Sequence, residues 1–184
     1  VAGLGKVKIV ATEPERQIYN AIVSRYSQLK NNHPSFPVKN FYNESAFSQR
    51  LAKHKYDLVD LSEELLRQSA ANKYLYTVEG IVRLLGITKL DGHLSIPVNI
   101  QEFSDYSLKV LITIKQALAE FGATEPEKHI ALIRSAWNLR AILSPSPIKP
   151  DVLQDLAYFS DRYFYDMSYA PMGIPRDTVW NDLP

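Results

Sequence analysis

The 184-residue chain contains no cysteine, so it can form neither a disulfide framework nor a thiolate metal site. It also has no apolar run near the roughly 18 residues that a membrane span needs. Its first residues lack the long apolar core of a signal peptide. These absences favour a soluble protein that does not bind membranes.

The common catalytic signatures are missing as well. The sequence has no Gly-rich phosphate loop of either common type and no Gly-x-Ser-x-Gly nucleophile turn. Its four histidines are scattered along the sequence, and none forms a His-x-x-x-His pair. We therefore predict no catalytic residue, no metal site and no cofactor, and an enzyme is disfavoured.

Charge is distributed unevenly along the chain. Residues 1–56 carry nine Lys or Arg against three acids, whereas residues 150–184 carry six Asp against two Arg. Two solvated faces would explain this pattern. It would also fit end-to-end attraction between copies of the chain, or a basic groove for a polyanion.

The phrase Ala-Thr-Glu-Pro-Glu occurs twice, at residues 11–15 and 123–127. Each copy is typical of a helix start, because the threonine can cap the first turn and proline is tolerated there. We therefore predict Thr12 and Thr124 as N-caps. Apolar spacing and stop signals predict helices over 12–30, 62–72, 77–85, 103–121, 124–143 and 151–165, with a loop over 88–100.

These helices predict a mainly α fold: a single-domain helical bundle of about six helices over residues 1–167. An α/β alternative stays open. Residues 6–10, 37–41 and 56–61 have patterns compatible with short strands, and together they would make a small β-α-β-α-β unit at the N-terminus.

Residues 168–184 are predicted to form an extended C-terminal arm. Pro171 and Pro175 prevent a long helix there, and the segment is too apolar to be left exposed. We expect it to cross an apolar surface of a neighbouring copy, with Trp180 as the anchor. The other assembly residues are Met172, Ile174 and Val179.

Residues 158–169 are rich in aromatic side chains, which core packing would explain. Tyrosine is also frequent at interfaces and under stacked bases. Arg134, Arg140 and Arg162 are expected nearby, where they could form a phosphate or base pocket. Pairing of these arginines with neighbouring aspartates is the alternative.

Trp137-Asn138-Leu139-Arg140, a turn broken by Pro145 and Pro147, and an aromatic helix over 156–167 follow one another. This order resembles coat proteins of flexible filamentous plant viruses. The resemblance implies an all-α subunit that polymerises through extended arms and coats single-stranded RNA. An aspartate near the RNA groove of that family is in register with Tyr163 here, and Asp161 and Asp166 flank this tyrosine.

The sequence thus predicts a structural, self-assembling subunit, with single-stranded RNA as its candidate cargo, located in the cytoplasm or in a virion. The candidate nucleic-acid residues are Arg134, Arg140, Arg162, Asp161 and Tyr163. Two other functions stay open. One is a monomeric helical adaptor that binds a protein through the aromatic helix, and the other is a small α/β enzyme built on the N-terminal strands.

Overall fold

The computed structural model describes residues 11–13, 17, 20–21, 24–25, 38–40, 53–61, 74–100, 104–135 and 138–171. The chain divides into two compact units, residues 1–53 and 54–184. The predicted boundary between a 1–167 domain and a 168–184 arm stays a prediction, because residues 172–184 lie outside the described residues.

The first unit contains a parallel strand pair. β1 (Ala11–Glu13) lies beside β2 (Val38–Asn40), and the described residues at 17, 20–21 and 24–25 between them are helical. Parallel neighbours need a long crossover, which a helix supplies. The predicted helix is therefore present in part, but Thr12 lies within β1 and is not its N-cap. Residues 6–10 lie outside the described residues.

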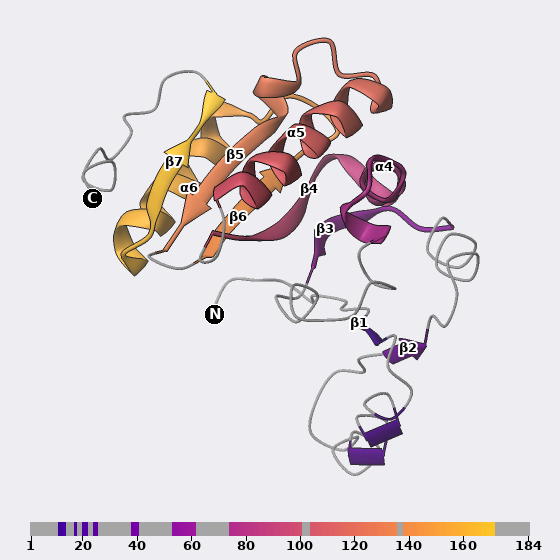
Figure 1. The fold of residues 1–184 in the computed structure, drawn as a ribbon. Helices are drawn as coiled ribbons and strands as arrows, with labels where there is room; N and C mark the ends of the chain where they lie inside the picture. The colour runs from indigo at the N-terminus through magenta and orange to yellow at the C-terminus, as the bar shows by residue number, and fades with distance from the viewer. Residues whose placement is uncertain are drawn as a thin grey trace. The chain divides into compact units, whose positions relative to one another are not determined.

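The second unit contains a mixed five-stranded sheet with the order β3-β4-β6-β5-β7 (Figure 1). β3 and β4 are parallel, and every other neighbouring pair is antiparallel. The strands are β3 (Tyr56–Asp60), β4 (Thr88–Asn99), β5 (Ile130–Arg134), β6 (Asn138–Leu143) and β7 (Asp166–Tyr169). The helices are α4 (Val78–Ile87), α5 (Ser104–Phe121), α6 (Pro150–Tyr163) and the short 3₁₀ helix η2 (Pro126–His129).

Helices cover both faces of this sheet, with α4 and α5 on one side and α6 on the other (Figure 1). On the first side, α4 and α5 lie against β4. Ile81 of α4, Leu118 of α5 and Ile96 of β4 are all fully buried. On the other side, Leu153 of α6 belongs to a smaller cluster. Its remaining buried members are Ala131, Ile148, Met167 and Ala170. From Leu94 to Val98 both faces of β4 are buried, whereas β5 and β6 alternate between buried and half-buried residues.

The mainly α bundle is wrong, and the α/β alternative describes the molecule better. Three helices were predicted correctly in position. α4 begins after Thr77, whose hydroxyl accepts the N–H of Gly80 at 3.1 Å, as an N-cap should. α5 and α6 also match their predictions. Gly86, however, does not stop α4, which continues to Ile87.

The predicted loop at residues 88–100 is the twelve-residue strand β4. Its Asp-Gly pair and its proline both resemble turn signals, but each fits a particular feature of the sheet. A Cβ at Gly92 would lie 2.8 Å from the carbonyl oxygens of Tyr56 and Asp57, so only glycine allows β3 to approach here. The last residue of β3, Asp60, pairs with Ser95, and Pro97 lies two residues further along β4. Proline has no backbone N–H, but β3 has already ended at this point and offers no acceptor for one.

The predicted helix at 124–143 is also wrong, because these residues form η2 and the β5–β6 hairpin. The N-cap of η2 is Glu125 and makes no side-chain cap, so Thr124 does not cap a helix. Alternate residues of β5 and β6 are buried, which is the period of a strand. Ser135 closes the hairpin, because its N–H donates to the Asn138 carbonyl at 2.8 Å.

None of the helices in the described ranges is long and apolar enough to cross a bilayer.

A glycine pair provides a stability test of this sheet. Gly92→Ala should lower the free energy of unfolding by about 1–3 kcal/mol, because the new methyl group would contact two β3 carbonyls. Gly86→Ala is the matched control. Its methyl group would meet no atom within 4 Å, and alanine should stabilise helix α4 by about 0.5–1 kcal/mol. Urea unfolding of both variants measures the difference, and equal effects would contradict the close β3–β4 approach.

Candidate functional site

A polar cluster of Asp60, Leu61, Ser95 and Arg140 lies where β3 ends; we call it the Arg140 cluster. Nη1 of Arg140, on β6, donates to Oδ1 of Asp60 at 2.6 Å and to Oγ of Ser95 at 2.9 Å. The same nitrogen donates to the carbonyl oxygen of Leu61 at 3.2 Å. The Leu61 N–H in turn donates to the Ser95 carbonyl at 3.0 Å. One guanidinium group thus joins β6 to the end of β3.

The strand register explains why these side chains meet. Paired residues on neighbouring strands project from the same face, and so do residues two apart on one strand. Asp60 pairs with Ser95, and Arg140 pairs with Pro97, two residues further along β4. All three polar side chains therefore project from one face of the sheet. This is also the face covered by α6, since Ile142, two residues after Arg140, packs against the α6 cluster.

Tyrosine side chains border the Arg140 cluster. The Tyr76 hydroxyl donates to the carbonyl oxygen of Pro97 at 3.0 Å. Burial raises the pKa of Tyr76, the nearby Tyr106 raises it further, and the charge of Arg140 opposes the rise. Tyr76 therefore remains protonated at neutral pH, as a donor must. The Tyr76 hydroxyl thus binds the edge of β4 beyond the point where β3 ends.

Asp60 differs from the rest of the cluster in its exposure. About half of its side chain (53%) is open to solvent, against 30% for Arg140. Oδ1 is held by Arg140, whereas Oδ2 has no hydrogen-bond partner within the described part of the chain. Asp60 is also the last residue of β3, at the carboxyl end of the parallel pair. Ligands of open α/β sheets bind at the carboxyl ends of parallel strands.

The other two candidate arginines lie elsewhere. Arg134 pairs with Leu139, so it projects from the face opposite Arg140. Its Nε lies 3.3 Å from Oδ2 of Asp166, whose side chain is only 3% exposed. Arg134 therefore pairs with an aspartate of the same chain, which is the alternative that the sequence left open. Arg162, on α6, donates to the Tyr158 hydroxyl at 3.2 Å.

The aromatic segment is exposed, so core packing does not explain it. Tyr163 and Phe164 are 55% and 92% exposed, and Phe159 stacks on Tyr165 at a ring distance of 5.7 Å. Asp161 is also exposed on α6. The residues proposed for nucleic-acid binding are thus spread over both faces of the sheet and the surface of α6. Residues 172–184, with the four assembly residues, lie outside the described residues.

No group of three or more His, Asp or Glu side chains that could hold a metal ion occurs among the described residues. Sequence inspection missed Asp60 and Ser95 as site residues. Asp60 lies near the end of the alternating segment 56–61, which has the pattern of a strand. A carboxylate at a strand end was the available signal, but its partner lies 80 positions further along the chain.

No protein-family model matches the chain, and no curated protein does. Among solved structures, it is similar to human methyltransferase-like protein 13 in complex with SAH. The identity is 16% and the TM-score 0.48, and the match covers 95% of this chain and 77% of that one. A likeness at this score indicates neither an activity nor a ligand for the chain.

The predicted coat subunit is wrong. It required an all-α protein, but Asn138, Leu139 and Arg140 of the Trp-Asn-Leu-Arg motif lie in strand β6 of a mixed sheet. The mixed sheet therefore does not support an all-α subunit that coats RNA in a filament. Association of the chain with itself, or with RNA outside such a filament, stays a prediction.

Arginine-to-lysine substitutions test the structural role of the Arg140 cluster. Arg140→Lys should lower the free energy of unfolding by about 1–2 kcal/mol, because the shorter lysine side chain does not bring its ammonium group to the position of Nη1, which donates all three hydrogen bonds. Arg162→Lys, on the exposed face of α6, should change it by less than about 0.5 kcal/mol. Urea unfolding measures both. Equal losses would mean that Arg140 does not hold the end of β3.

Proposed function

We propose that this chain is an α/β enzyme, or a part of one, that binds a small amine substrate at Asp60. One observation carries the proposal. At the carboxyl end of the parallel strand β3, Asp60 has one oxygen held by Arg140, and about half of its side chain (53%) is exposed. Asp60 therefore offers a fixed acceptor at the edge where α/β sheets bind their ligands.

The chemistry of the acceptor selects the substrate class. A carboxylate accepts hydrogen bonds, and its charge attracts an ammonium group. Because Arg140 fixes Oδ1, Oδ2 points in one direction and does not sample many rotamers, which lowers the entropy cost of binding. A carboxylate in this position can bind an amine and orient its nitrogen by accepting hydrogen bonds from it. Ser95 and Arg140 position Asp60 for that role.

Binding of simple amines to the full chain tests this proposal. Propylamine should shift the amide NMR signals of Asp60, Leu61 and Ser95, whereas propanol should not, because it lacks the positive charge. SAH is included as an additional probe. Asp60→Asn should weaken propylamine binding about tenfold or more, since a charge-assisted hydrogen bond is lost.

Asp155→Asn is the matched control, because Asp155 is exposed on α6 and outside the cluster. It should leave the affinity for propylamine unchanged. Equal binding by the Asp60→Asn variant, or signal shifts confined to residues elsewhere, would exclude Asp60 as the amine site. Thermal unfolding of each variant separates a lost ligand contact from a lost fold.

A further inference from the structure

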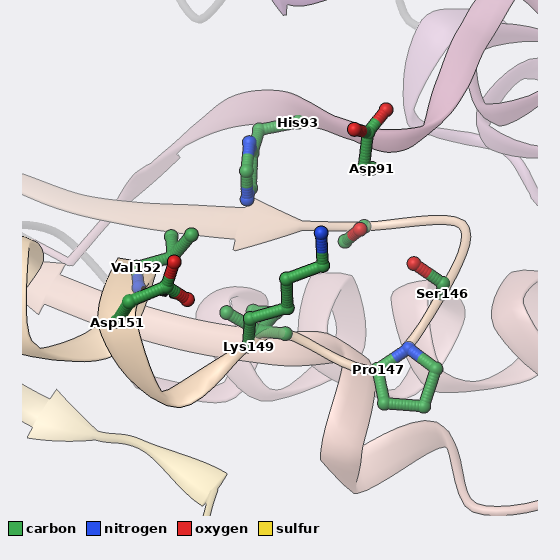
Figure 2. A pocket seen from close by; sticks show the side chains of 9 residues that line it. Asp91, His93, Ser146, Pro147, Lys149, Asp151 and Val152 are labelled. Carbon is green, nitrogen blue, oxygen red and sulfur yellow. Dashed lines mark hydrogen bonds between the residues drawn. The ribbon is translucent and has the colours of Figure 1, made fainter.

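A cavity of about 210 Å³ lies between the start of β4, the segment after β6 and the first turn of α6 (Figure 2). It is lined by Asp91, His93, Ser144, Ser146, Pro147, Ile148, Lys149, Asp151 and Val152. No residue of the Arg140 cluster lines it. Its volume is many times the space that one water molecule needs, so it can hold a small organic molecule.

Two basic side chains project into this cavity. Figure 2 shows the His93 ring extending from β4 and the Lys149 ammonium group extending from the start of α6 toward the same strand. Burial lowers the pKa of His93, while nearby Asp91 opposes that shift, so His93 is neutral at pH 7. Within the described ranges, Lys149 has neither a hydrogen bond nor an ion pair. A cation without a counter-ion thus adjoins a neutral imidazole.

The remaining polar groups restrict what can bind. The Asp91 carboxylate is turned away from the other labelled side chains (Figure 2). Asp151 is exposed, and its Oδ1 accepts the Val152 N–H at 3.0 Å. The Ser146 hydroxyl donates to the Leu90 carbonyl at 2.5 Å. Two carboxylates at the rim repel a doubly charged anion more strongly than a singly charged one.

We propose that this cavity binds a small monocarboxylate, with Lys149 as its counter-ion and His93 as a second donor. The inference is independent of the amine site, because the two sites share no residue. A bound carboxylate favours the charged imidazole, so it raises the pKa of His93 above that of the free protein. Binding therefore takes up a proton, and affinity should increase as the pH falls from about 8 to 5.5.

The other titratable groups at the cavity are Asp91 on β4, Lys149 just before α6 and Asp151 on α6. Burial lowers the pKa of His93, so a bound carboxylate, which favours the charged imidazole, acts against that shift. The imidazole signals of His93 therefore report on the site directly.

Titration of the full chain with sodium propionate, followed by NMR of the histidine rings and by calorimetry, tests the proposal. Propionate should shift the His93 signals and raise its pKa, whereas propionamide, its neutral isostere, should bind at least tenfold more weakly. Lys149→Gln should reduce propionate affinity about tenfold or more. Lys115→Gln, on the exposed side of α5, is the matched control and should not change it.

His93→Gln should remove the pH dependence of binding while leaving the Lys149 contribution in place. If this variant does not fold, the titration of His93 in the unaltered chain gives the same information. Unchanged affinity in a folded Lys149→Gln protein would overturn the proposal. Equal binding of propionamide and propionate, or a His93 pKa unaffected by propionate, would overturn it as well.

Discussion

The second unit depends on one backbone constraint: strand β4 must satisfy its hydrogen bonds on both sides while its two faces are buried. β4 is parallel to β3 on one side and antiparallel to β6 on the other. A buried N–H or C=O group without a hydrogen-bond partner lowers the stability of the fold. The strands β3 and β6 must therefore begin and end at residues that leave no such group of β4 unpaired. Gly92 allows β3 to come close, and Pro97 lies where β3 has ended. The polar cluster of Asp60, Ser95 and Arg140 forms at that end.

The helices of this unit could be predicted because their signals are local. Thr77 is a good N-cap, α5 has apolar residues along one long segment, and α6 begins with a proline and an aspartate. Each of these features acts within one or two turns of the chain. The strands are different, since partners such as Asp60 and Ser95 lie far apart in sequence. Nothing local specifies such a pair.

Two strand segments were misread for physical reasons. In β4, Asp-Gly and a proline resemble turn signals, although glycine and proline also occur in sheets where a neighbouring strand approaches closely or ends. In β5 and β6, most residues are apolar, a pattern that a buried helix allows as well as a strand does, and the alternation of buried residues appears only in the folded sheet. The repeated Thr-Glu-Pro-Glu phrase misled for a related reason. Threonine is β-branched and fits a strand such as β1 as well as it fits a helix cap.

The candidate sites were the least predictable part of the molecule. The sequence singled out Arg140, but as part of an RNA pocket with arginines that the sheet places elsewhere. Its actual partners, Asp60, Leu61 and Ser95, come from β3 and β4 and depend on the strand register. His93 and Lys149 are likewise brought together by the sheet and the start of α6. Both polar sites therefore require β4 to be a central strand.

Amide hydrogen exchange across β4 tests that requirement most directly. Because the Ser95 carbonyl faces β3, strand alternation directs the N–H groups of Leu94, Ile96 and Val98 toward β6. These three amides should exchange as slowly as global unfolding allows, together with their partners on β6. If they exchange as fast as those of an exposed loop, β4 is not a central strand and the account of both sites is wrong.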